Sequence, residues 1–237
     1  DAAAALSVQV HPTDEHASRS EAGARGKTEA WVVLHAAPGS RIYAGLKPGV
    51  TAAAIRVALA EKRMADCLHT FAPVAGDCVF LAAGTVHALG ADLLIFEAQQ
   101  TSDITYRLHD WDRVDTKTGR PRPLHVEESL ACTNFDSGPC HPVRPVPEAP
   151  GRERLVDCNY FRLWRVRAES EFPVGAIGEC RIVVAVDGDA RLSAGGHDYP
   201  LRPGDVYLLP AELGAARCRA NGRATLLEVG LPRCAST

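Results

Sequence analysis

Two ligand-type side chains, Gln9 and His11, stand close together in the segment LSVQVHPTDEHA near the start of the chain. Val8 and Val10 alternate with them, which is the period-two pattern of a strand with one apolar face. Gln9 and His11 are therefore expected to point together toward the opposite face. Two residues this close, both able to bind a metal, indicate a ligand pair on one strand.

Glu29 and His87 extend this set, because both lie on predicted strands or strand ends, in GKTEAW and GTVHALG. Burying these polar groups unpaired would cost several kcal/mol for the charge, and a shared cation would remove that cost. Imidazole nitrogens with carboxylate and amide oxygens suit zinc or another first-row divalent ion. An incomplete protein shell would leave a position open for water or substrate, as catalytic sites require.

Composition limits the possible partners of the chain. Its 237 residues are 46% hydrophobic, with a formal net charge of −3 and no run of Lys or Arg. A nucleic-acid or membrane surface is therefore not expected, and no stretch approaches the roughly 18 apolar residues of a membrane span. The opening DAAAALS lacks an initiator Met and the pattern of a signal peptide, so we expect a chain trimmed at its N-terminus.

The eight cysteines form no CxxC pair and are spread along the whole chain. Four disulfides of a secreted scaffold would be one interpretation, but buried, reduced thiols suit a core of this size better. This favours a cytoplasmic protein.

Short apolar segments bounded by Gly and Pro indicate an all-β chain of sandwich or barrel type. The predicted strands are TEAWVVLHAA, CVFLAAGTVHALG, LLIFEAQQ, TYRLHDW, RIVVAVDG, ARLSA and DVYLLPA. Two stretches have helical spacing instead, an insertion at about 51–69 and a second at 124–133. We expect the first of them to cap one barrel mouth.

The chain is predicted to contain the same barrel twice. AGDCVFLAAGTVHALG and PGDVYLLPAELGAA share a Gly-Asp, an apolar run and a turn of small residues. Between them, 135–153 holds five prolines and reads as an extended linker. The predicted domains are 1–134, a metal-binding barrel, and 154–237, a degenerate barrel without metal, whose one histidine is His197.

Five segments in this order, VQVHP, GKTEAW, GDCVFLAAGTVHALG, FEAQQTSDITYRLHDWDR and LHVEESL, resemble type I mannose-6-phosphate isomerases, particularly the shorter bacterial branch. The resemblance is close from Leu6 to about Leu130 and looser beyond. It implies two cupin (jelly-roll) barrels, the first binding one zinc ion. The cupin signature runs from Gly76 to His87, with Ala82 in place of its proline. Family members also begin with roughly seventy more residues, so the first barrel is expected to be incomplete.

By position, the resemblance implies His11, Glu29 and His87 as metal ligands, with Gln9 as a fourth. It implies Arg107 as the catalytic arginine and Lys27 and Glu97 as further catalytic residues. From the residues alone, three structural interpretations stay open: Arg107 as an ion-pair partner of Asp103 or Asp110, Lys27 as a solvated loop charge, and Glu97 as a barrel residue paired with a neighbour. Because Arg107 follows His87 by twenty positions (107 − 87 = 20), a strand out and a return along the neighbouring strand would aim it at the metal cavity.

The implied reaction interconverts mannose 6-phosphate and fructose 6-phosphate through an enediolate. It needs a Lewis acid, a base within reach of the C1 and C2 protons, and a cation for the developing charge. Glu97, Lys27 or a metal-bound water could be the base, and the sequence does not choose among them. The partner is then a small sugar phosphate, and the protein a monomer or a weak homodimer.

Two other functions remain possible. A non-catalytic cupin that binds a sugar or sugar phosphate would keep the barrel, but would not need Lys27 and Arg107 beside the metal ligands. A metal-dependent cupin oxygenase would use iron, and typically a His-x-His motif in place of Gln9-x-His11.

Overall fold

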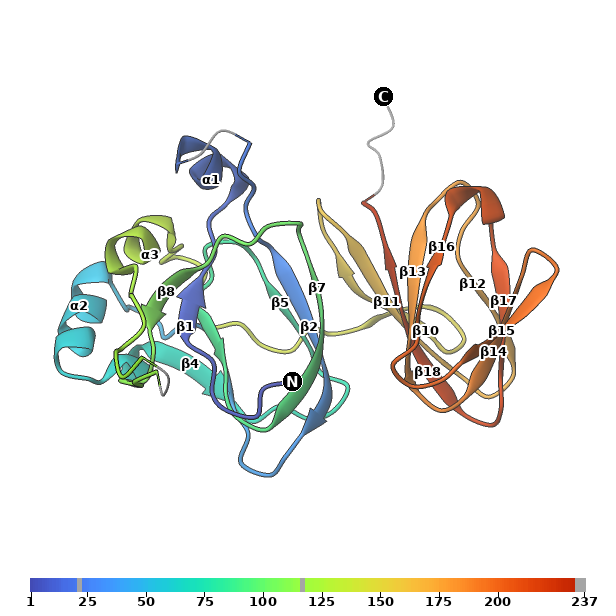
Figure 1. Cartoon of the computed structure of the whole chain (residues 1–237), viewed down its shortest axis with the longest axis horizontal. Helices are drawn as coiled ribbons and strands as arrows, with labels where there is room; N and C mark the ends of the chain where they lie inside the picture. The colour runs from blue at the N-terminus through green and yellow to red at the C-terminus, as the bar shows by residue number, and fades with distance from the viewer. Residues whose placement is uncertain (21–22, 116–117, 233–237) are drawn as a thin grey trace. The chain divides into compact units, whose positions relative to one another are not determined.

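The computed structural model of the protein describes residues 1–20, 23–115 and 118–232, and divides the chain into two compact units. The first unit is Asp1–Pro142 and the second is Val143–Thr237. Each is built mainly from antiparallel strands (Figure 1). The prediction of an all-β chain with a small helical insertion is confirmed.

The first unit contains eight strands, three α-helices and one 3-10 helix within its described part. In chain order they are β1 (Val8–Val10), α1 (Asp14–Ser20), β2 (Glu29–Ala36), β3 (Ile42–Leu46), α2 (Ala52–Ala60), η1 (Met64–Cys67), β4 (Leu68–Phe71), β5 (Cys78–Leu81), β6 (His87–Leu89), β7 (Leu93–Gln99), β8 (Tyr106–His109) and α3 (Val126–Cys132). A five-stranded sheet has the order β4-β3-β6-β1-β8, and a three-stranded sheet has the order β5-β2-β7.

The alternation of apolar and polar residues in strand β1 places them on opposite faces of the sheet. Val8 and Val10 are fully buried and pack in one apolar cluster with Ile55 and Ala58 of α2. Gln9 projects to the opposite face, where its amide approaches the His87 ring. The five-stranded sheet therefore has an apolar face covered by helices and a face that carries ligand-type side chains.

Helix α2 follows the Pro48-Gly49 turn, and the Thr51 side chain caps it by accepting a hydrogen bond from the Ala54 N–H at 3.2 Å. Its buried residues, Ile55 and Ala58, are three positions apart and so share one face. That face packs on the outside of the five-stranded sheet, beside α3 (Figure 1). The expectation that this insertion caps a barrel mouth is therefore wrong.

The predicted insertion at 51–69 also extends too far. Helix α2 ends at Ala60, and the short helix η1 ends at Cys67. Leu68–Phe71 is strand β4, which pairs with β3. Leu68 is buried and Thr70 donates its hydroxyl to the Ile42 carbonyl, so pairing with the sheet decides the conformation of this segment.

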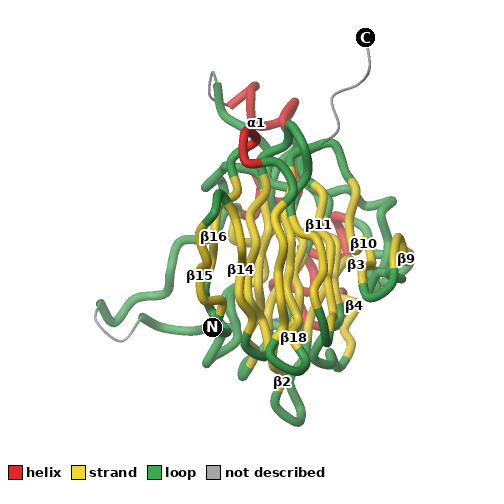
Figure 2. The backbone as a smooth tube through the Cα atoms, turned by 90° about the vertical axis from the view of Figure 1, so that its right-hand side faces the viewer, coloured by secondary structure: helices red, strands yellow, loops and turns green. Residues whose placement is uncertain are grey.

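The second unit contains ten strands and one 3-10 helix within its described part. They are β9 (Val146–Ala149), β10 (Arg152–Asp157), β11 (Arg162–Ala168), β12 (Glu171–Val174), β13 (Arg181–Asp187), β14 (Ala190–Ala194), β15 (His197–Leu201), β16 (Val206–Leu209), η2 (Ala211–Leu213), β17 (Ala216–Ala220) and β18 (Ala224–Gly230). Figure 2 shows several of these strands running alongside one another.

These strands form a six-stranded sheet, β16-β13-β18-β11-β10-β9, and a four-stranded sheet, β12-β17-β14-β15. One apolar cluster joins them, with Val183, Leu192, Leu201 and Leu226 at its centre. The predicted linker 135–153 is not connector throughout, because β9 and the first residues of β10 lie inside it and pair with each other.

Within the described residues, no helix combines the length and the apolar character that crossing a membrane would require.

Candidate metal centre and catalytic residues

Three strands bring His11, Glu29 and His87 together in the first unit. His11 directly follows β1, Glu29 opens β2 and His87 opens β6. Each is 1% exposed, and one ligand atom from each lies within 4.8 Å of the other two. No other group of three or more His, Cys, Asp and Glu side chains in the described part of the chain meets this condition.

The atoms that converge are those a metal would use. His11 Nε2 lies 3.2 Å from Glu29 Oε1, and His87 Nε2 lies 3.5 Å from Glu29 Oε2. His11 Nε2 and Glu29 Oε2 are buried without a hydrogen-bond partner. Buried polar atoms rarely stay unpaired, and two imidazoles with one carboxylate fit a divalent first-row cation. The residues present therefore fit a metal site.

Two backbone carbonyls orient the imidazoles. His11 Nδ1 is 2.8 Å from the Ile104 carbonyl oxygen, and His87 Nδ1 is 2.8 Å from the Thr85 carbonyl oxygen. Each Nδ1 must carry the proton to donate this bond, which leaves Nε2 with its lone pair free. Both rings are thus held in the tautomer that a metal ligand requires.

Gln9 lies beside the cluster. It pairs with His87 across β1 and β6, and its Nε2 is 3.4 Å from His87 Nε2. The amide reaches the same nitrogen that faces Glu29. Gln9 is therefore placed where its oxygen could contribute a fourth ligand after a flip of the amide.

The protonation states of the cluster suit a cation. Burial lowers the pKa of His87 to about 4, so its imidazole is neutral near pH 7. Burial alone would raise the pKa of Glu29, but the close contacts of its carboxylate with His11 and His87 outweigh it, and the pKa is lowered. A neutral imidazole and an ionised carboxylate are the forms that bind metals.

Lys27 and Glu97 adjoin the cluster. Lys27 Nζ is 2.7 Å from Glu29 Oε1 and 3.5 Å from Glu97 Oε1, and the Lys27 side chain is 13% exposed. The interpretation of Lys27 as a solvated loop charge is therefore wrong. Glu97 does pair with neighbours, as one interpretation expected, but those neighbours are the residues of the candidate centre.

Glu97 has the titration of an acid–base group. Burial, its hydrogen bond with Glu29 and the charge of Glu29 raise its pKa to about 7, against the opposing effect of Lys27. A carboxyl group with such a pKa exchanges a proton readily at neutral pH.

Arg107 lies on β8, where it pairs with Gln9 of β1. Because paired residues share a face, Arg107 is on the side of the sheet that carries Gln9 and His87. The chain between His87 and Arg107 does not return along the strand next to β6, as expected. Strand β7 joins the other sheet, and β1 separates β8 from β6. Among the described residues no carboxylate forms an ion pair with Arg107, and Asp110 pairs with Arg113 and Arg122 instead.

The sequence did not identify the contacts that hold the Lys27 segment. Gln100 accepts from the Thr28 N–H at 2.8 Å and donates to Asp14, and Asp14 accepts from the Gly26 N–H at 2.7 Å. Asp14 and Gln100 are 86 positions apart, so no local pattern signals this contact. The only sign in the sequence was the pair Gln99-Gln100 shortly after Glu97, whose side chains are able to make such hydrogen bonds.

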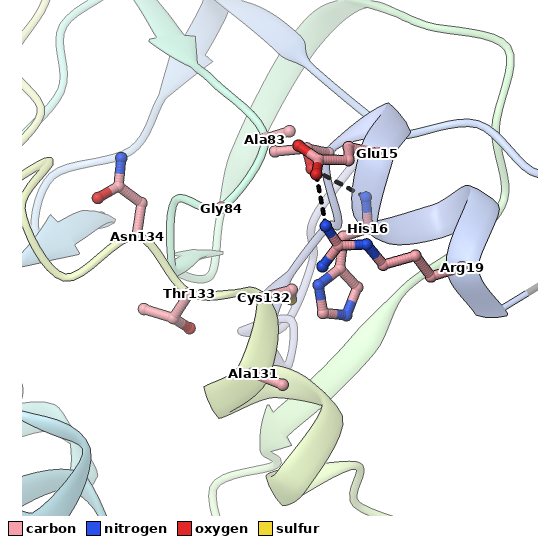
Figure 3. Close-up of a pocket in the computed structure, with 10 residues that line it drawn as sticks. Glu15, His16, Arg19, Ala83, Gly84, Ala131, Cys132, Thr133 and Asn134 are labelled. Atoms are coloured by element: carbon pink, nitrogen blue, oxygen red, sulfur yellow. Dashed lines mark hydrogen bonds and ion pairs between the residues drawn. The ribbon is translucent and has the colours of Figure 1, made fainter.

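A surface pocket of about 330 Å³ lies at the end of α1 and the turn that precedes His87 (Figure 3). Glu15 and Arg19 point toward one another in it and form an exposed ion pair at 2.5 Å. Thr13, Gly84 and Thr133 also line it, but His11, Glu29 and His87 do not. This pocket is therefore distinct from the buried cluster of candidate ligands.

Comparison with known proteins gives a consistent result. The chain is 33% identical over 216 residues to the mannose-6-phosphate isomerase ManA of Bacillus subtilis, and 35% identical over 208 residues to the mannose-6-phosphate isomerase of Streptococcus mutans. These alignments cover 90% and 86% of this chain, and 68% and 64% of the relatives. The chain thus spans about two thirds of their length. No family model matches it.

The crystal structure of the mannose 6-phosphate isomerase from Bacillus subtilis superposes with a TM-score of 0.85 at 26% identity, covering 95% of this chain and 71% of that one. A putative mannosephosphate isomerase from Archaeoglobus fulgidus shares the fold, with a TM-score of 0.75 at 21% identity. The expected pair of cupin barrels is confirmed. With this fold and these relatives, the chain belongs to the mannose-6-phosphate isomerase family of aldose–ketose isomerases.

Proposed function

We propose that the protein is a zinc-dependent isomerase that interconverts mannose 6-phosphate and fructose 6-phosphate through an enediolate. The observation that carries the proposal is the buried cluster of His11, Glu29 and His87 in a chain of this family. Two of its converging atoms have no other hydrogen-bond partner.

His11, Glu29 and His87 would hold the metal, with Gln9 as a fourth ligand. When bound, a divalent ion supplies a Lewis acid that stabilises negative charge on the substrate oxygens. Zinc suits two nitrogen donors and a carboxylate. Burial keeps competing water away from these ligands and strengthens every charge interaction around them.

Glu97 is the group that we assign to proton transfer between C2 and C1. Its pKa of about 7 allows it to accept the proton from one carbon and return it to the other. Lys27, 3.5 Å from Glu97, would keep this carboxylate in place and donate to a substrate oxygen. Arg107 stays protonated and would counter the charge that grows on the enediolate.

A coupled assay for fructose 6-phosphate together with elemental analysis tests the proposal. We expect about one zinc per chain and turnover that is lost on chelation and restored by zinc. Protein that binds zinc and mannose 6-phosphate without converting it would be a binding protein, and that result would overturn the proposal. Iron together with oxygen consumption would favour an oxygenase instead.

We propose a cytoplasmic location and a monomeric or weakly dimeric state. In the described part of the chain Cys67, Cys132, Cys140, Cys158, Cys180 and Cys218 are thiols outside any disulfide, which suits a reducing compartment. Size-exclusion chromatography with light scattering tests the oligomeric state, and a stable dimer or tetramer would contradict it.

A further inference from the structure

Arg107 is held by hydrogen bonds from one short segment, Pro123–His125. The Arg107 N–H donates to His125 Nδ1 at 3.1 Å, and the His125 N–H donates to the Arg107 carbonyl at 2.8 Å. The guanidinium Nη1 donates to the Pro123 carbonyl at 2.9 Å. Backbone and side chain of Arg107 are thus fixed together by residues that follow it by 16 to 18 positions.

The His125 ring makes this contact although it stands at the start of α3. A side chain at this position usually accepts from the first N–H groups of the helix, but the His125 side chain makes no such cap. Its Nδ1 faces the N–H of Arg107 instead, so the ring acts as a hydrogen-bond acceptor. Because β8 is the edge strand of its sheet, His125 also satisfies backbone groups that no further strand pairs.

These hydrogen bonds hold Arg107 without pairing its guanidinium with a carboxylate, so its positive charge can interact with a bound anion. Asp110 is the nearby acid, and it is occupied by Arg113 at 2.5 Å and by Arg122 at 2.5 Å. Arg107 Nε is buried without a hydrogen-bond partner. The Pro123 carbonyl orients the guanidinium without neutralising it, and the His125 ring fixes the main-chain N–H of the same residue. A carboxylate bound to the guanidinium would instead compete with an anionic substrate.

We propose that His125 is the positioning residue of Arg107, which keeps the guanidinium aimed at the anionic, enediolate-forming part of a sugar phosphate. This inference rests on the proposed function, because it presumes that Arg107 stabilises charge in the reaction. His125 itself contacts no substrate. Its contribution reaches the reaction entirely through the conformation of Arg107.

A double-mutant cycle with His125→Ala and Arg107→Ala tests the inference. His125→Ala should lower kcat roughly 10- to 100-fold, the scale of a misplaced group, with unchanged zinc content. In the Arg107→Ala background the same substitution should change kcat less than about twofold, because the group that it positions is gone. His125→Asn should retain most of the turnover, since its amide oxygen can accept from the Arg107 N–H.

Glu128→Ala is the matched control, because Glu128 is exposed on the first turn of the same helix and does not contact Arg107. It should leave kcat unchanged. Amide hydrogen exchange of a peptide covering β8 gives a second readout that does not depend on activity. Exchange there should accelerate in His125→Ala and stay slow in Glu128→Ala.

Equal losses of kcat in both backgrounds, or an unaltered exchange rate at β8, would overturn the inference. If His125→Ala does not fold, the same cycle with His125→Phe, whose ring cannot accept the hydrogen bond from the Arg107 N–H, retains the test. An inactive wild-type protein with zinc bound would overturn the proposed function itself, whereas an active one without coupling between His125 and Arg107 overturns only this inference.

Discussion

Matched positions in the two barrels carry charges of opposite sign. Strand β2 lies between β5 and β7, and strand β13 lies in the same way between β16 and β18. Glu29 opens β2 opposite Leu81 and Gln99, and Arg181 opens β13 opposite Leu209 and Gly230. The residue that could bind a metal in one barrel is thus replaced by a permanent cation in the other.

The charged residues around Glu29 and Arg181 differ between the two barrels in the same way. Lys27 and Glu97 flank Glu29, whereas Glu179 and Glu228 flank Arg181 at 2.6 and 3.2 Å. Glu228 lies opposite Val183, the second residue after Arg181, just as Glu97 lies opposite Trp31, the second residue after Glu29. The sequence did suggest a second barrel without a ligand set, but its acid at 228 lies in register and is paired with arginine.

The guanidinium of Arg181 has room because of Gly230. A Cβ at that position would lie 1.6 Å from Arg181 Nη1, where the first barrel has Gln99. Trp164 completes the arrangement, with the Arg181 guanidinium 4.5 Å from its ring centroid. One β scaffold thus places either a candidate metal ligand, Glu29, or the covalently attached cation of Arg181 at the same position.

His87→Ala should have the largest effect, because it removes one of the proposed zinc ligands. We expect loss of bound zinc and a fall in turnover of at least about 10³-fold. Elemental analysis and the isomerase assay measure both. Ala216 is buried and opens β17 as His87 is buried and opens β6, so Ala216→Gly is the control in the second barrel and should leave zinc and turnover unchanged. Retained zinc in His87→Ala would break the comparison.

Arg181→Met should destabilise the second unit without affecting the first. Removing one partner of a buried ionic network leaves Glu228, which is fully buried, with Arg152 as its remaining ion-pair partner. We expect the free energy of unfolding to fall by about 3 kcal/mol. Urea denaturation measures it by Trp fluorescence in a Trp31→Phe and Trp111→Phe background, where Trp164 alone reports the second unit. Glu171→Gln, at an exposed ion pair with Arg217, serves as control, and equal stability of both variants would contradict the prediction.

Glu97→Gln should lower turnover roughly 10²-fold while zinc stays bound. With a pKa of about 7, Glu97 is protonated below that pH and ionised above it, so wild-type turnover should increase as the pH rises through about 7. The variant should lose this rise. Its counterpart Glu228→Gln should keep the pH profile, and a pH profile that is the same in Glu97→Gln and wild type would remove Glu97 from the reaction.

Chelation should have the smallest effect on stability, and that effect should be confined to the first unit. Removing zinc from the first barrel should lower its unfolding temperature by about 5–10 °C, because a ligand stabilises only the fold that binds it. The second barrel holds its cation covalently and should unfold at the same temperature with or without chelator. Differential scanning calorimetry resolves the two transitions. Parallel shifts of both would show that they are coupled.

Alternation and ligand type were enough to predict β1, β2, β7 and β8 and the residues of the cluster, whereas β3, β9 to β12, β15, β17 and β18 were not predicted. Val8 and Val10 identified the inward face of Gln9, and the buried polar cost of His11, Glu29 and His87 indicated a cation. Leu68–Phe71 was misassigned because its apolar residues also continue the helical spacing of the preceding segment. Pairing with β3, which no local pattern reports, decides its conformation.

The contacts that orient the site residues could not be predicted from the sequence, for a different reason. Ile104 and Thr85 orient the imidazoles through carbonyl groups, which every residue type possesses. His125 appeared only as a residue of the predicted helical stretch 124–133, whereas it precedes the first residue of α3. Its role depends on β8 being an edge strand, a property of the whole sheet and not of any segment.

The position of β1 between β6 and β8 has a consequence for biosynthesis. Gln9 and His87, which are in contact, are 78 positions apart. The Ile104 carbonyl, which orients the His11 ring, lies 93 positions after His11. Contacts between residues so far apart in the sequence form slowly, because the entropy of closing a long loop is lost before the contact stabilises the fold. On the ribosome His11 therefore remains without its orienting carbonyl until β8 has emerged. Metal loading is expected to be among the last events in the maturation of the first barrel, and zinc supplied during early synthesis would find no preformed site.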